Sequence, residues 1–169
     1  MKNRKDIWGS LLLTGGILIL DQITKAVIVH LIPRNTVGIS FWGDFFRIIH
    51  VRNPGIAFSL GDGMPLLLRK GLFIILPLVI LVLLAVYTLK NPRLPRLQRY
   101  AIAGILGGGL GNILDRIFRP LGVVDFLDFR FYGLFGLERW PTFNVADMSV
   151  VISGILLVLA FIFEERKSS

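Results

Sequence analysis

Four apolar stretches, each long enough to cross a lipid bilayer as a helix, dominate this sequence and leave few folds open to it. In lipid the backbone polar groups must be satisfied within the segment, so each stretch is predicted to be an α-helix. A hydrophobic content of 54% is also a level that soluble domains rarely reach. We predict an all-α membrane protein, a bundle of four transmembrane helices in a single domain over residues 1–169, with spans at 8–31, 71–89, 100–118 and 145–163.

The third span is rich in glycine. Small residues let helices approach one another closely in lipid, where there is no hydrophobic force to bring them together. We therefore expect this helix at the centre of the bundle, packed through Gly104, Gly107, Gly108, Gly109 and Gly111.

Basic residues near the span ends predict the orientation, because short cytoplasmic segments carry an excess of Lys and Arg. Three such segments fall on one side of an even-numbered bundle: the N-terminal tail, the turn at 90–99, which has no acid, and the C-terminal tail. Both termini are therefore predicted to be cytoplasmic. The loops 32–70 and 119–144 then face outward, where the branched and aromatic runs at 45–52 and 128–131 predict short strands in a small extracytoplasmic β and loop cap.

Composition excludes several classes of function. The net charge of +8 is scattered between apolar runs instead of forming one basic face, so we expect no nucleic-acid partner. The chain has no cysteine and only two histidines, which argues against thiol catalysis and against a zinc site. We therefore expect neither a metal nor a cofactor.

Acidic residues gather at one depth of the predicted bundle. Asp21, Asp115, Asp125 and Asp147 come from segments far apart in the sequence, yet the direction of each span places all four near the outer leaflet. Placing an ionisable side chain in or beside a span costs free energy, so such an acid is expected to have an ion-pair partner or a function. The convergence predicts a functional site close to the outward face.

Two carboxyl groups held close together in a poorly hydrated place cannot both ionise cheaply, so one keeps its proton while the other remains a base. Such a pair activates water for attack on a peptide carbonyl. We choose Asp125 and Asp147 as the pair. The apolar surroundings of Asp125 favour its protonated form, and the helix start at Asp147 favours the ionised form.

Five sequence blocks, in order across all four spans, make the chain resemble the lipoprotein signal peptidases, or signal peptidase II, a bacterial family of membrane aspartic proteases. The blocks are Asp21 to Lys25, Asn53 to Ser59, Gly108 to Arg116, Val123 to Phe126, and Phe143 to Asp147.

The resemblance implies that Asp125 and Asp147 are catalytic and that the enzyme acts in the bacterial inner membrane. It implies a prolipoprotein substrate, cleaved just before a cysteine that carries diacylglycerol. It also implies that eight further residues support the site or hold the substrate: Asp21, Lys25, Asn53, Gly55, Asn112, Asp115, Arg116 and Asn144. We expect membrane lipid as the surrounding partner and a monomeric enzyme.

Simpler structural roles compete with these assignments. Asp21 and Lys25 also fit an intrahelical ion pair, and the Asn112 to Arg116 segment fits a helix end at the interface. The Asn53 to Gly55 segment is also a turn sequence, and Asn144 and Asp147 also fit helix caps. For Asp125 the alternative is a loop acid paired with an arginine, Arg116 or Arg119.

Two rival functions come from other classes. A proton-coupled transporter would have acids along the full depth of the bilayer, and a membrane scaffold would use the glycine-rich span without needing acids. Within the protease hypothesis, the first outward loop is predicted to act as a lid, with Gly55, Gly61 and Gly63 as its mobile points.

Overall fold

A computed structural model describes residues 2–55, 65, 68 and 71–168. Its helices are α1 (Lys2–Leu31), α3 (Leu76–Lys90), α4 (Arg96–Phe118) and α5 (Val145–Ser168). One π-helical turn at Gly71–Ile75 leads into α3, and a short 3-10 helix lies at Leu134–Gly136. Within the described ranges, four helices are long and apolar enough to cross a membrane, which agrees with the four predicted spans.

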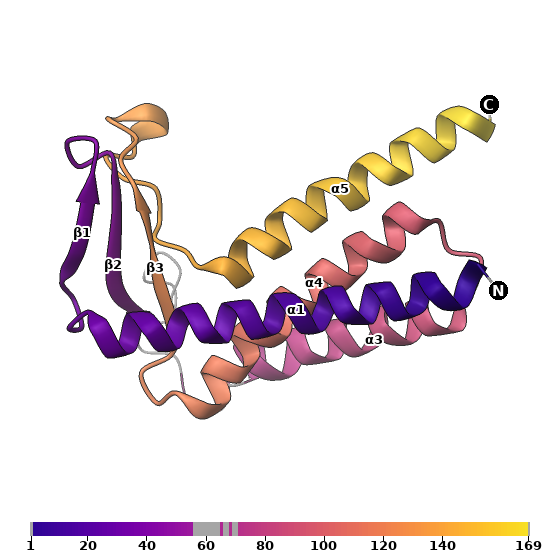
Figure 1. Ribbon diagram of the computed structural model, residues 1–169, viewed down its shortest axis with the longest axis horizontal. Helices are drawn as coiled ribbons and strands as arrows, with labels where there is room; N and C mark the ends of the chain where they lie inside the picture. The colour runs from indigo at the N-terminus through magenta and orange to yellow at the C-terminus, as the bar shows by residue number, and fades with distance from the viewer. Residues whose placement is uncertain (1, 56–64, 66–67, 69–70, 169) are drawn as a thin grey trace.

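A small three-stranded antiparallel sheet lies at one end of the helices (Figure 1). It consists of β1 (Val37–Phe41), β2 (Phe46–Asn53) and β3 (Val123–Phe129), in that order. Both chain ends lie at the opposite end of the helices (Figure 1). If the helices cross a bilayer, the sheet and the two termini therefore lie on opposite sides of it.

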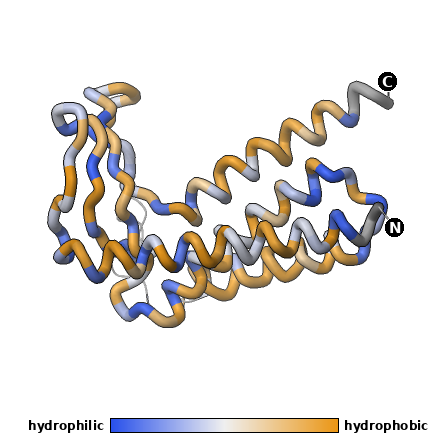
Figure 2. The backbone as a smooth tube through the Cα atoms, in the orientation of Figure 1, coloured by the Kyte–Doolittle hydropathy of each residue, from blue (hydrophilic) through white to orange (hydrophobic). Residues whose placement is uncertain are grey.

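The backbone tube in Figure 2 is apolar along most of each helix. Residues such as Leu12, Leu83 and Val151 are exposed, as expected of side chains that meet lipid. Polar residues gather at the two ends of the bundle and at the junction with the sheet (Figure 2). This distribution fits a bundle whose long sides face lipid and whose two ends face water.

The glycine-rich helix α4 is the central helix, as predicted. More than half of its apolar window is buried, against 11–17% for the other three spans. A methyl group at Gly107 would lie 2.8 Å from the Thr14 carbonyl of α1, and one at Gly109 would lie 2.8 Å from Leu81 of α3. A methyl at Gly108 would press on the Ala146 carbonyl of α5. Three consecutive glycines therefore each admit a different neighbouring helix.

The third strand differs from the sequence prediction. The pattern at 128–131 predicted a strand there, but β3 begins at Val123, and Arg130 forms only an isolated bridge with Arg139. The reason is the apolar, branched sequence at the start of the strand. Val124 and Phe126 pack with Ile28 and Ile32 from the end of α1, which buries this edge of the sheet against the bundle. Asp125 therefore lies in a strand and not in a loop.

Ion pairs fasten the outer part of the sheet. The Asp128 side chain is almost fully buried, and its carboxylate lies 2.6 Å from Arg47 of β2 and 2.8 Å from Arg139. Arg139 also lies 3.1 Å from Asp44 in the β1–β2 turn. These contacts hold the segment after β3 against the sheet, and that segment forms one wall of the candidate site.

Candidate active site

A fully buried charged cluster joins α1 to α4. The Nζ atom of Lys25 lies 2.8 Å from Asp21 and 3.2 Å from Asp115, and all three side chains have no exposed surface. The Asp21–Lys25 pair is thus present within one helix, as the simpler reading predicted. It also binds a second helix, so it holds the bundle together as well as neutralising a buried charge.

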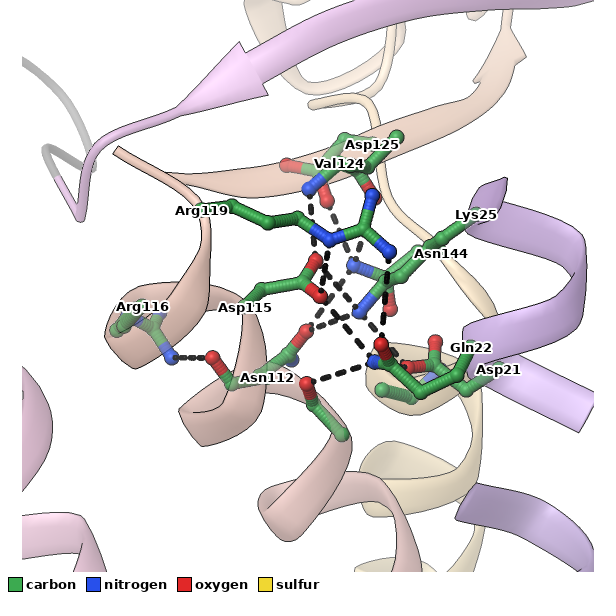
Figure 3. A network of polar contacts seen from close by, with 12 residues as sticks. Asp21, Gln22, Lys25, Asn112, Asp115, Arg116, Arg119, Val124, Asp125 and Asn144 are labelled. Atoms are coloured by element: carbon green, nitrogen blue, oxygen red, sulfur yellow. Dashed lines mark hydrogen bonds and ion pairs between the residues drawn. The ribbon is translucent and has the colours of Figure 1, made fainter. Parts of the chain in front are cut away.

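Each acid of this cluster also binds the backbone of a distant segment. Asp21 accepts a hydrogen bond from the N–H of Ala146 at 3.0 Å, and Asp115 accepts one from the N–H of Val124 at 3.0 Å. Ala146 directly precedes Asp147, and Val124 directly precedes Asp125. The cluster therefore fixes the main chain one residue before each of the two predicted catalytic acids. Figure 3 shows Asp115 below Val124 and Asp125 in this network.

Asn144 connects those two acids. Its Nδ2 donates to Asp125 at 2.7 Å, while its Oδ1 accepts from the N–H of Asp147 at 2.9 Å. The Asp147 carboxylate in turn accepts from the N–H of Asn144 at 3.1 Å, which completes a reciprocal cap at the start of α5. Asn144 therefore caps α5, as the simpler structural role predicted. The same side chain also links the Asp125 carboxylate to the backbone N–H of Asp147.

Three asparagine side chains surround the acids, and each has its orientation fixed by a donor that cannot act as an acceptor. The carbonyl of Asn112 accepts from Lys25, that of Asn144 from the Asp147 N–H, and that of Asn53 from the Gly55 N–H. Their NH2 groups must therefore point toward the carboxylates. Asn112 donates to Asp147 at 2.7 Å and Asn53 donates to Asp125 at 3.1 Å.

Gly55 and Arg116 hold different positions in the site. Gly55 has a φ of +92°, a conformation that favours glycine, and this places its N–H on Asn53. The Arg116 guanidinium donates to the Asn112 carbonyl of its own helix at 3.3 Å and lies close enough to Asp147, Asp125 and Asp115 to attract them. Its Nε is buried without a hydrogen-bond partner among the described residues.

The two predicted catalytic acids line one cavity of about 580 Å³. Apolar side chains form most of its wall, including Trp140 and Phe143 from the segment before α5 and Met148 and Val151 on α5 itself. Burial, followed by the charge of Asp147, raises the pKa of Asp125 to about 6. Hydrogen bonds from Asn53 and Asn144 oppose that rise. The cavity thus contains a carboxyl group that holds a proton far more readily than an ordinary aspartate.

The structure brings nine of the ten predicted site residues into one connected network, and Gly55 joins it through its backbone. Asp125 makes no ion pair with Arg116 or Arg119 among the described residues; its hydrogen-bond partners are Asn53 and Asn144. Gly61 and Gly63, two of the three predicted mobile points of the lid, lie outside the described residues, so the lid stays a prediction.

Sequence reasoning missed two side chains of the network. Gln22 donates to Asp21 at 3.1 Å and to Asp115 at 3.2 Å, and Arg119 lies 3.0 Å from Asp115. Both sit next to a predicted residue, by one position in the case of Gln22 and by one helical turn in the case of Arg119. That adjacency was the available signal, but adjacency alone does not reveal which neighbours of a buried acid face it.

Comparisons with known proteins agree on one family. A family model described as signal peptidase (SPase) II matches residues 13–163. A lipoprotein signal peptidase of Treponema pallidum (strain Nichols) is 42% identical over 98% of this chain and 89% of its own length. One from Borrelia hermsii (strain HS1 / DAH) is 46% identical over 99% of this chain and 97% of its own.

Two solved structures share the fold. Both are described as bacterial membrane enzymes determined by the in meso method, at 2.3 Å and 1.9 Å resolution. The first has a TM-score of 0.79 and 29% identity, over 96% of this chain and 93% of that one. The second has a TM-score of 0.76 and 30% identity, over 92% of this chain and 93% of that one.

Proposed function

The chain belongs to the signal peptidase II family, and we propose that it is an aspartic endopeptidase that removes signal peptides from prolipoproteins. The substrate is a precursor whose cysteine carries diacylglycerol, and the cut falls just before that cysteine. Asp125 and Asp147 are the catalytic acids. The observation that supports this most is that both line the same cavity and both are hydrogen-bonded to Asn144.

The reaction needs one water molecule and one proton shared by the two acids. Asp147, at the N-terminal end of a helix and bonded to the Asn112 NH2 group, is ionised and takes a proton from the water. Asp125 is protonated and donates a hydrogen bond to the substrate carbonyl oxygen as the water oxygen attacks the carbonyl carbon. When the tetrahedral intermediate collapses, the proton held by Asp147 passes to the leaving amine of the cysteine.

A substrate that stays in the membrane suits the walls of the cavity. Met148, Val151 and Ile152 line it from α5, a helix whose apolar residues are otherwise exposed to lipid. A signal peptide or an acyl chain can therefore reach the acids without leaving apolar surroundings. Asp125 and Asp147 then meet the scissile bond at the end of the bundle that carries the sheet.

We place that end on the outer side of the bacterial inner membrane, with both termini in the cytoplasm. The turn between α3 and α4 and the first helical turn of α4, at the end with the termini, contain Arg93, Arg96 and Arg99 and no acid. A proton-coupled transporter is disfavoured because the buried acids of the described residues, Asp6 excepted, are gathered near the sheet and do not follow the depth of the bilayer. At the other end Asp6 pairs with Arg96 at 2.8 Å.

Cleavage is tested with purified protein in detergent and a diacylglyceryl-modified precursor. Loss of the signal peptide is followed by a gel shift and by the mass of the released peptide. The matched control is the same precursor with its cysteine changed to serine, which cannot be lipidated. We expect only the lipidated precursor to be cut, and cleavage of both at the same rate would contradict the proposed substrate.

The rate of cleavage should depend on the proton of Asp125. Its pKa is raised from an ordinary value of 3.8 to about 6, so the protonated form is lost as the pH rises through about 6. We expect kcat/KM to fall above that pH, by up to about tenfold per pH unit. Initial rates between pH 4 and 9 provide the check, and a rate that is constant from pH 5 to 8 would contradict the role of Asp125.

A further inference from the structure

Arg52 of β2 has two other arginines, Arg34 and Arg119, near enough for their charges to act on it. Arg52 is next to Asn53, so in an extended strand its side chain lies on the opposite face from the catalytic acids. Its Nη1 lies 3.4 Å from the Gly122 carbonyl, in the turn that begins with Arg119. The turn after α1, which contains Arg34, is hydrogen-bonded to His50 of the same strand at 2.7 Å.

Two of these arginines, Arg34 and Arg52, have few partners for their charge among the described residues. The Nε of Arg52 is buried and has no hydrogen-bond partner among the described residues. In the same part of the chain, neither Arg34 nor Arg52 makes an ion pair, whereas Arg119 lies 3.0 Å from Asp115. Burial and the nearby charges of Arg119 and Arg34 lower the pKa of Arg52. Asp115 attracts Arg52 as well, but it is already shared between Lys25 and Arg119.

Like charges on long side chains separate in water unless something holds them together. Converging guanidinium groups with free N–H donors match the oxygens of a phosphate, which accepts several hydrogen bonds at once. The position of these arginines also indicates whether the phosphate belongs to a lipid or is free in solution. Arg34 follows the end of α1 and Arg119 follows the end of α4, so both lie where a spanning helix leaves the hydrocarbon and meets the lipid headgroups.

We propose that Arg34, Arg52 and Arg119 bind the phosphate of a membrane phospholipid beside the active site, on the opposite face of β2. This lipid is a bound partner and not the substrate, because the proposed substrate is held by diacylglycerol and needs no phosphate. The site therefore stands whether or not the proposed protease activity is correct.

Binding is measured as the lipid-induced rise in the unfolding temperature of the full-length protein in detergent. The probes are phosphatidylglycerol, diacylglycerol with the same acyl chains and no phosphate, and inorganic phosphate. The variants are Arg52→Gln and Arg34→Gln, with Arg130→Gln as the matched control, since Arg130 is paired with Glu138 in the outer cap. Arg34 is exposed, so its replacement tests the site even if Arg52→Gln impairs folding.

We expect phosphatidylglycerol to stabilise the wild type and the Arg130→Gln variant, and diacylglycerol to have no such effect. Half-maximal stabilisation of Arg52→Gln and of Arg34→Gln should need about tenfold more phosphatidylglycerol, the loss expected for one charge-assisted hydrogen bond. Equal responses of all variants, or of both lipids, would overturn the proposal. A response to inorganic phosphate as large as that to the lipid would assign the site to free phosphate and overturn its assignment to a lipid.

Discussion

Replacing either Asp125 or Asp147 with asparagine is expected to lower the rate of signal-peptide removal by at least about 10³-fold. Asparagine has nearly the shape of aspartate, but it neither accepts a proton from water nor holds one for the carbonyl oxygen. Asp147 has the first of these roles and Asp125 the second, so the loss of either acid stops the attack of water on the peptide carbonyl. Initial rates with the lipidated precursor give the measurement, and the helical circular dichroism spectrum of each variant shows whether it is folded.

The matched control for these variants is Asp6→Asn. Asp6 is likewise a largely buried aspartate, but it pairs with Arg96 and lies at the other end of the bundle. We expect this variant to cleave at nearly the wild-type rate. Asp125→Asn or Asp147→Asn with more than a tenth of the wild-type activity would remove that residue from the catalytic pair.

The second large effect is expected from Lys25→Met, which keeps a long side chain and removes its charge. Lys25 separates Asp21 and Asp115, which have no exposed surface. Breaking a buried ion pair by removing one partner costs roughly 3–5 kcal/mol, because the remaining charge has neither partner nor water. We therefore expect a much lower unfolding temperature in detergent than for Lys90→Met, whose lysine is exposed at the end of α3.

Activity should fall together with that stability. The two acids beside Lys25 bind the N–H groups of Ala146 and Val124, which precede Asp147 and Asp125. A cluster that rearranges around a missing charge will shift both segments and separate the catalytic pair. The triple variant Asp21→Asn, Lys25→Met, Asp115→Asn removes the unpaired charges and should regain part of the stability. An unfolding temperature of Lys25→Met equal to that of the wild type would refute this role.

Several features followed from the sequence because they depend on patterns along one segment. The apolar stretches predicted four membrane-spanning helices, and four helices long and apolar enough to span a membrane are present among the described residues. The glycines of α4 predicted a central helix, since only a helix with close neighbours on several sides needs them. The gathering of Asp21, Asp115, Asp125 and Asp147 followed from the direction of each span and the rise of a helix per residue.

Other features depend on contacts between segments that have no signature in spacing. The sequence indicated that Asp21 and Lys25 form a pair, but not that Asp21 also binds the backbone of Ala146, 125 positions away. It offered Asn144 as a helix cap, and the structure shows that the same amide also reaches Asp125. Such double roles become visible only when the direction of each donor and acceptor is known.

The start of β3 shows why element boundaries were harder to predict. Alternation at 128–131 suggested a strand there, because it matches the pattern of a half-exposed sheet. The strand instead includes Val123 to Phe126, where every side chain is buried and no alternation is visible. Packing against the end of α1 causes this burial, and it also places Asp125 in poorly hydrated surroundings.

The most direct test of the paired acids is the titration of Asp125 itself, followed by carboxyl-carbon NMR of protein labelled at its aspartates. Wild-type protein should show one carboxyl group that titrates near pH 6, and this signal should be absent from Asp125→Asn. In Asp147→Asn the signal should move to lower pH, because the neighbouring negative charge that helps to retain the proton has gone. An unchanged midpoint in Asp147→Asn would mean that the two carboxyl groups do not interact, and they could not then share a water molecule.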